Sequence, residues 1–343
     1  MRDRAIGALV AAGLPLALLT ASPALAQTDP PATETPEFET LCTPTDPRLA
    51  ELSGLVSSGS TLYAIGDSGS DDAVAVMDRS CAVSEWLTVP VDPYDVEDIA
   101  ATDTDLWLGD TGDNDRRRDT VALTRMDRET GAGELYRLTY PDGAHDAETL
   151  LLQPDGVPLI VTKNVVGASS VYRPVGGTSV DELAQPGPSP LEKVGDIDVS
   201  ATAEQGAIGS VMFTGGAVSA DGTVAAVRSY SDVYLFPVTD GNVGDALVSG
   251  EAVRVPLPDQ PQGEAVAFTD SGDLLIASEA RDGALPPIQI LRNATDIVTP
   301  GGSEAPGRES EWSTSPVWFG IGLVVLGGVA AAALVGVRRV RRS

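Results

Sequence analysis

Apolar and polar positions follow one arrangement that recurs five times between residues 50 and 295. Each repeat opens with a short apolar segment led by an acidic or small residue. It then passes through a polar turn into a second apolar segment that ends in a polar or charged residue. The paired segments occupy residues 53–56 with 62–67, 97–100 with 106–110, 148–151 with 159–163, 216–219 with 224–228, and 264–267 with 275–279.

Further apolar segments follow these pairs and complete the repeat. Third segments lie at 121–126, 171–172, 233–238 and 288–291, and fourth segments at 135–140 and 253–257. Four short strands per repeat, joined by turns rich in Gly and Asp, are typical of β-propeller blades, and no part of this region has a long helical period. The sequence therefore predicts an all-β fold, a β-propeller with five visible blades over residues 38–298. The long gap between the third and fourth repeats leaves room for a sixth.

The two ends of the chain predict export and membrane anchoring. Residues 1–26 combine two early arginines, an apolar run and an Ala-Leu-Ala cleavage pattern, which indicate a secretory signal peptide. Residues 317–337 are uncharged and long enough for one transmembrane helix, and the arginine-rich tail 338–343 places its end in the cytoplasm. Residues 27–37 and 299–316 have the composition of flexible linkers. We therefore expect a single-pass membrane protein with an extracellular propeller.

The two cysteines, Cys42 and Cys81, are predicted to form a disulfide, because an exported chain folds in an oxidising compartment. No fourth strand is evident after residue 291. Residues 40–42 could supply it as the outer strand of the last blade. The disulfide would then clamp the position at which the ring of blades closes.

Composition excludes several classes of partner. The chain has 50 acidic and 22 basic residues and a net charge of −28, which opposes binding to nucleic-acid phosphates. Its single histidine excludes a multi-histidine metal site. Six arginines lie in the predicted signal peptide and cytoplasmic tail, so the extracellular part is more acidic still.

Equivalent positions of the repeat should form rings around the channel, because the first strand of each propeller blade lines it. One ring, at the start of the first strand, contains Glu97, Glu148 and Glu264, with Asp95 and Asp146 two residues before the first two. A second ring, at the end of the next strand, contains Asp67, Asp110, Lys163, Arg228 and Glu279. The second ring mixes both charges and differs between blades, as expected of a binding site. Turn-forming or solvated acids at the rim are the alternative interpretation.

The loop at 109–115 is rich in Asp and Gly, and the loop at 66–72 resembles it. Calcium is bound by six to eight oxygen atoms, which such loops can provide, although an ordinary acidic turn explains them equally well. The predicted calcium ligands are Asp67, Asp95, Glu97, Asp110, Asp113, Glu148 and Glu279. His145 is either a base near the channel or an ordinary histidine at the rim.

The segments 95–100 (DVEDIA), 146–150 (DAETL) and 263–267 (GEAVA) resemble blade openings of bacterial secreted propellers related to β-propeller phytases and their esterase-like relatives. That resemblance implies a calcium-dependent phosphomonoesterase whose acids bind metal, with Lys163 and Arg228 in the position of phosphate-binding cations.

Two functions remain open from the sequence. One is a cell-surface propeller that binds an extracellular ligand or envelope protein at its acidic channel mouth, with calcium. The other is a calcium-dependent hydrolase of phosphoesters or lactones. Its candidate catalytic residues are Glu97, Glu148, Glu264, Lys163 and Arg228.

Overall fold

The structure, a computed structural model, describes residues 37–298 except 68, 166–167, 201, 204–207 and 282. Apart from residue 37, the predicted signal peptide 1–26, linkers 27–37 and 299–316, transmembrane helix 317–337 and tail 338–343 lie outside the described residues. Within the described part of the chain, no helix is long and apolar enough to cross a membrane.

The strands form five blades, each a four-stranded antiparallel sheet. Blade 1 contains β2 (Leu52–Ser58), β3 (Thr61–Gly66), β4 (Ala73–Asp78) and β5 (Val83–Thr88). Blade 2 contains β6 (Val96–Ala101), β7 (Asp105–Asp110), β8 (Val121–Asp127) and β9 (Gly133–Thr139). Blade 3 contains β10 (Ala147–Leu152), β11 (Pro158–Thr162), β12 (Ser169–Pro174) and β13 (Ser189–Ile197).

Blade 4 contains β14 (Phe213–Val218), β15 (Val224–Ser229), β16 (Asp232–Pro237) and β17 (Val253–Pro256). Blade 5 contains β18 (Gln262–Phe268), β19 (Leu274–Glu279), β20 (Ile288–Leu291) and, from the other end of the propeller sequence, β1 (Phe38–Cys42). Helical segments are short: α1 (Val243–Ser249) and the 3-10 turns η1 (Pro47–Leu49), η2 (Val175–Gly177), η3 (Val180–Glu182), η4 (Ile208–Ser210) and η5 (Ala294–Ile297).

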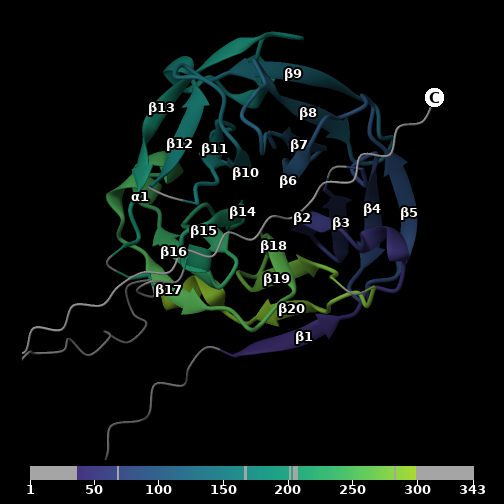
Figure 1. The fold of residues 1–343 in the computed structure, drawn as a ribbon. Helices are drawn as coiled ribbons and strands as arrows, with labels where there is room; N and C mark the ends of the chain where they lie inside the picture. Colours follow the sequence, from purple (N-terminus) through teal and green to yellow (C-terminus); the bar gives the residue numbers. More distant parts are fainter. Residues whose placement is uncertain are drawn as a thin grey trace, which may run out of the picture. The chain divides into compact units, whose positions relative to one another are not determined.

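The blades form a ring with their first strands at the centre (Figure 1). Successive inner strands β2, β6, β10, β14 and β18 contact one another, and β18 contacts β2. A short parallel contact between Ser189 of β13 and Leu138 of β9 also joins the outer edges of blades 3 and 2. The extra length between the third and fourth repeats belongs to the outer half of blade 3 and its connection to blade 4. The described residues therefore contain five blades and no sixth.

The hydrophobic core lies between the blades. The described residues form five buried clusters, and each joins side chains of two neighbouring blades. In β19, Leu275 and Ala277 belong to the cluster shared with blade 1, whereas Leu274 and Ile276 belong to the cluster shared with blade 4. Because both faces of a second strand are buried, it is a continuous apolar run rather than an alternating one. This explains the uninterrupted second segment of each repeat.

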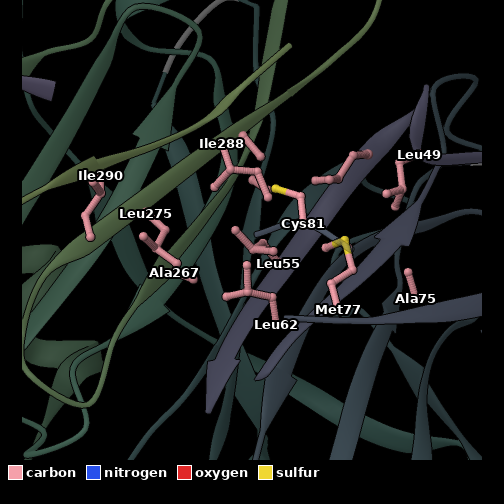
Figure 2. Close-up of a cluster of buried hydrophobic side chains, with 14 residues drawn as sticks. Leu49, Leu55, Leu62, Ala75, Met77, Cys81, Ala267, Leu275, Ile288 and Ile290 are labelled. Atoms are coloured by element: carbon pink, nitrogen blue, oxygen red, sulfur yellow. The ribbon is translucent and has the colours of Figure 1, made fainter. Parts of the chain in front are cut away.

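The ring closes between blades 5 and 1, as predicted. β1 pairs antiparallel with β20, with Phe38 opposite Leu291 and Cys42 opposite Ile288. Cys42 is bonded to Cys81, which lies in the turn between β4 and β5, and their Cα atoms are 5.7 Å apart. Figure 2 shows Cys81 among the buried side chains of both blades. The predicted disulfide and the predicted closing strand are therefore both confirmed.

Replacing Cys42 and Cys81 together by serine should lower the free energy of unfolding by about 4 kcal/mol, because the bond closes a loop with a sequence separation of 39 residues. Denaturant unfolding of the full-length protein measures the loss. Chemical reduction of the wild type should produce the same loss without a mutation. An unchanged midpoint in both experiments would contradict a stabilising role for this bond.

Candidate functional site

A β-bulge interrupts the inner strand of every blade near its first residue. The register shifts at Ser53 in β2, Glu97 in β6, Glu148 in β10 and Thr214 in β14, and across Glu264 in β18. A bulged residue is left out of the strand pairing, and its side chain is aimed differently from those of its neighbours. The five bulges are equivalent, so they bring one side chain per blade to the same end of the channel. Three of these five side chains are glutamates.

The short hydroxyl side chains in this ring connect neighbouring blades. Ser53 Oγ donates to the backbone oxygen of Glu97 at 2.6 Å, and Thr214 Oγ1 donates to that of Gly263 at 2.9 Å. Both acceptors lie on the inner strand of the next blade. These bonds hold adjacent bulges together, so the ring positions are fixed relative to one another.

Five carboxylates from blades 1, 2 and 3 converge at this end of the channel. The first acidic triad consists of Asp67, Asp95 and Glu97, and the second of Glu97, Asp146 and Glu148. In each triad, one oxygen per residue lies within 4.8 Å of the others. Glu97 belongs to both triads. We call the two triads together the acidic cluster; all its members except Asp67 are buried.

Lys163, which directly follows β11, is the cation in contact with this cluster. Its ammonium forms an ion pair with Glu148 Oε1 and lies 5.1 Å from the ring centroid of Tyr230. The other oxygen, Glu148 Oε2, is buried without a hydrogen-bond partner. Burial lowers the pKa of Lys163, but Glu148 and Glu264 outweigh it and raise that pKa above its usual value. Lys163 therefore stays charged.

Burial and mutual repulsion raise the pKa values of the acids around the channel mouth. Burial followed by the charge of Glu148 raises the pKa of Glu97 well above its usual range, and burial followed by Asp67 raises that of Asp95 to about 7. Burial also raises the pKa of Glu264 to about 7, although Lys163 and Arg228 oppose it. Burial and the charge of Glu264 raise the pKa of Glu279 to about 7. These acids therefore keep their protons to a higher pH than free carboxyl groups do, and full ionisation would exceed the charge of Lys163.

The acidic loop after β7 supports the cluster from outside. Asp110 accepts hydrogen bonds from the backbone N–H groups of Tyr94 and Asp95, both at 3.1 Å, and forms an ion pair with Arg118 at 2.8 Å. Asp113 accepts from Arg118 N at 2.7 Å, and its own N–H donates to Asp146 Oδ1 at 2.9 Å. The carboxylates of Asp110 and Asp113 are used to hold the loop, and neither belongs to an acidic triad.

Gly112 in the same loop leaves the space that two carboxylates occupy. A Cβ atom at this position would overlap Glu97 Oε1 and Asp95 Oδ2. The cluster therefore depends on a residue without a side chain here. Asp146 is missing from our predicted set of calcium ligands, and the need for a glycine at position 112 was not predicted. Asp146 could have been included, because Asp95-x-Glu97 and Asp146-x-Glu148 share one spacing.

Arg228 does not occupy the second-ring position that the sequence predicts for it, so that prediction is corrected. It is fully buried on β15 and donates to the backbone oxygens of Ala265 at 3.0 Å and Ala277 at 2.9 Å. Strand pairing places Ser229 opposite Phe213 just as Thr162 lies opposite Ala147. The blade 4 equivalent of Lys163 is accordingly Tyr230. Arg228 instead joins blades 4 and 5.

His145 lies at the rim and contacts none of the clustered acids. Its Nε2 is 2.9 Å from Asp142 Oδ1 and 3.0 Å from the hydroxyl of Tyr172. Its ring also contacts Tyr140 edge-on, with centroids 5.0 Å apart. These partners account for the histidine without a role in the channel.

The carboxylate of Asp98, the residue after Glu97, links three inner strands by hydrogen bonds. It accepts hydrogen bonds from the N–H groups of Ile99 at 2.8 Å, Leu150 at 2.8 Å and Gly216 at 3.1 Å. Beyond it, a cavity of about 470 Å³ is lined by the far ends of all five inner strands. This cavity has a mixed lining, in which Leu55, Ile99 and Phe268 are apolar and Asp103, Arg128 and Asp270 are charged.

Comparison with known proteins does not assign this chain to a family. No protein-family model matches the chain, and no curated protein matches it. A streptogramin B lyase is 11% identical with a TM-score of 0.39, covering 74% of this chain and 97% of its own. Catalytically inactive virginiamycin B lyase from Staphylococcus aureus with quinupristin is 10% identical with a TM-score of 0.38, covering 71% and 82%.

A luciferin-regenerating enzyme is 13% identical with a TM-score of 0.38, covering 75% of this chain and 94% of its own. At these values the propeller assignment rests on the strand pairing of the chain itself. The activities named for those proteins remain theirs.

Without bound cations, the protein should lose thermal stability as the pH rises from 5 to 8. Asp95, Glu264 and Glu279 have folded-state pKa values of about 7, whereas the unfolded chain loses these protons near pH 4. Between those values the folded state binds more protons, so its free energy of unfolding falls with pH. Melting temperatures measured in a chelator at intervals across this range test the direction. Glu279→Gln should flatten the curve, and a stability that increases from pH 5 to 8 would refute the argument.

Proposed function

We propose that this protein is a cell-surface propeller that binds calcium at its acidic channel mouth and uses the ion to hold an extracellular ligand. The supporting observation is the pair of acidic triads that share Glu97, of which the second is paired with the ammonium of Lys163 through Glu148. Membrane anchoring and export are part of this proposal, and they rest on the sequence patterns of residues 1–26 and 317–343.

The residues present fit a hard divalent cation. Every candidate ligand atom is a carboxylate oxygen, the donor type that calcium, magnesium and manganese prefer. The buried Glu148 Oε2 lacks a protein partner, which is unfavourable unless a cation or water binds it. The absence of a side chain at Gly112 leaves the space that the carboxylates of Glu97 and Asp95 occupy.

Calcium is our choice among these ions because its coordination is irregular and flexible. The carboxylates come from strand ends and loops of three different blades, an arrangement that suits an ion with six to eight ligands better than a strict octahedron. The Cys42–Cys81 disulfide is in keeping with an oxidising compartment outside the cytoplasm.

The first acidic triad would hold the ion, since Asp67 keeps partial exposure and a ligand could approach from its side. A smaller cavity of about 260 Å³ is lined by Arg116, Arg117, Arg118 and Tyr140. These arginines belong to the loop that carries Gly112, and guanidinium groups bind carboxylate and phosphate well. We therefore propose that the ligand is rich in oxygen and carries an anionic group.

Glu97→Gln should weaken calcium binding at least about tenfold, because loss of even an outer-shell partner of a metal ligand costs that much. Glu97 is in both triads, so its replacement by Gln removes an ionisable ligand from each. Isothermal titration of the full-length protein with calcium measures the affinity. Glu85→Gln, at an exposed position of β5, is the matched control and should leave it unchanged. Equal affinities for Glu97→Gln and wild type would reject the assigned site.

A calcium-dependent hydrolase of phosphoesters or lactones is the second candidate, and one observation favours it. Glu279 is partly exposed at the channel mouth, belongs to neither triad, and has a pKa of about 7. A carboxylate with such a pKa can accept a proton from water near neutral pH. Lys163 would stabilise developing negative charge, and a bound cation would supply a Lewis acid. The resemblance to β-propeller phytases points the same way, although Arg228 is fully buried and bonded to backbone oxygens.

Turnover of a chromogenic phosphomonoester and of a simple lactone distinguishes the two candidates. If the protein is a hydrolase, Glu279→Gln should reduce kcat by about 100-fold or more, the usual contribution of a general base, with calcium affinity retained. Glu85→Gln again serves as the control. Absence of turnover of both substrates by the calcium-loaded wild type would reject the hydrolase and leave the binding function.

A further inference from the structure

The acidic cluster has the layout of two adjacent cation positions. Its two triads share the carboxylate of Glu97, and each contributes two further carboxylates of its own. A shared carboxylate between two oxygen-lined positions is the arrangement expected where two divalent ions lie about 3.5–4 Å apart. The cluster by itself would therefore accommodate a second ion beside the first.

Lys163 is fixed at the second of these positions. Its ammonium is paired with Glu148 Oε1, and its backbone N–H donates to Asp146 O at 2.9 Å. Glu148 contributes its triad carboxylate to this contact, whereas the bond to Asp146 is made by the main chain of that triad residue and fixes the backbone of Lys163. The side chain is also largely buried, with 14% of its surface exposed, so its positive charge is poorly screened by solvent. Both the main chain and the side chain of Lys163 are therefore held at this triad.

We infer that the Lys163 ammonium replaces a second divalent cation, so that the channel mouth binds one ion, at the first acidic triad, rather than two. This inference rests on the proposed calcium site. A tethered ammonium has no translational freedom to lose on occupying its position, whereas a free ion does. It also repels a divalent ion brought against Glu148, because the two positive charges would share one buried carboxylate.

Lys163→Met tests the inference, because methionine is of similar length and carries no charge. Calcium stoichiometry is measured on the full-length protein by equilibrium dialysis and isothermal titration. We expect one ion per chain in the wild type and two in Lys163→Met. Lys163→Arg keeps the charge and should still bind one.

The other lysine provides a matched control. Lys193 forms an ion pair with Asp196 at 2.7 Å and is more exposed than Lys163, with 39% of its side chain accessible. Lys193→Met should therefore bind one ion, as the wild type does. A general effect of lost positive charge would raise the affinity in both methionine variants without changing the number of ions.

The outcomes separate this inference from the proposed function. One ion in both wild type and Lys163→Met supports the calcium site and overturns the role of Lys163. No ion in the wild type with one in Lys163→Met refutes the native calcium site, yet it supports the lysine as an internal cation. No ion in either protein overturns both.

A second variant covers the case in which Lys163→Met does not fold without its ion pair. Combining Lys163→Met with Glu148→Gln removes both charges of the pair, leaving no unpaired carboxylate at Glu148. This double variant should bind one ion, because the second acidic triad has lost a ligand. Two ions in the double variant would overturn the assignment of the second position to Glu148.

Discussion

Closure of the ring is the constraint on which the rest of this structure depends. Each blade has two apolar faces, and each of the five buried clusters is shared between neighbouring blades. A blade therefore buries both faces only when both neighbours are in place. The last of these interfaces, between blades 5 and 1, requires β1 to pair with β20, and the Cys42–Cys81 bond fastens β1 to blade 1. Ring closure also brings the inner strands to their final spacing.

That spacing creates the electrostatic problem at the channel mouth. The bulges at Glu97, Glu148 and Glu264 aim three buried glutamates toward one region, where aspartates of the preceding loops join them. Burial disfavours their ionised forms, and their mutual repulsion adds to this. The protein offsets part of the cost with Lys163 and with the hydrogen-bonded loop of Asp110 and Asp113. Acids whose pKa values are shifted by burial and by one another cluster at functional sites.

Sequence patterns predicted much of the fold because they report local burial. The second segment of every repeat is apolar on both faces, and this property identified five blades. The closing strand and the disulfide were predictable because no fourth strand was evident after residue 291 and only two cysteines were available. The second ring was predicted less well, since the ends of apolar segments served as the alignment. Strand pairing and bulges set the true register, in which Tyr230 and not Arg228 corresponds to Lys163.

The amino-acid sequence thus determined the strand repeat, the number of visible blades, the paired cysteines and the presence of acids at the blade openings. Only the tertiary structure decided which acids meet. Asp98 accepts a hydrogen bond from Gly216, which is 118 residues away, and Asp67, Asp95 and Asp146 reach one region from three different blades. The physical reason is that apolar periodicity reflects each strand's own neighbours, whereas convergence at the channel depends on bulges and on closure of the whole ring.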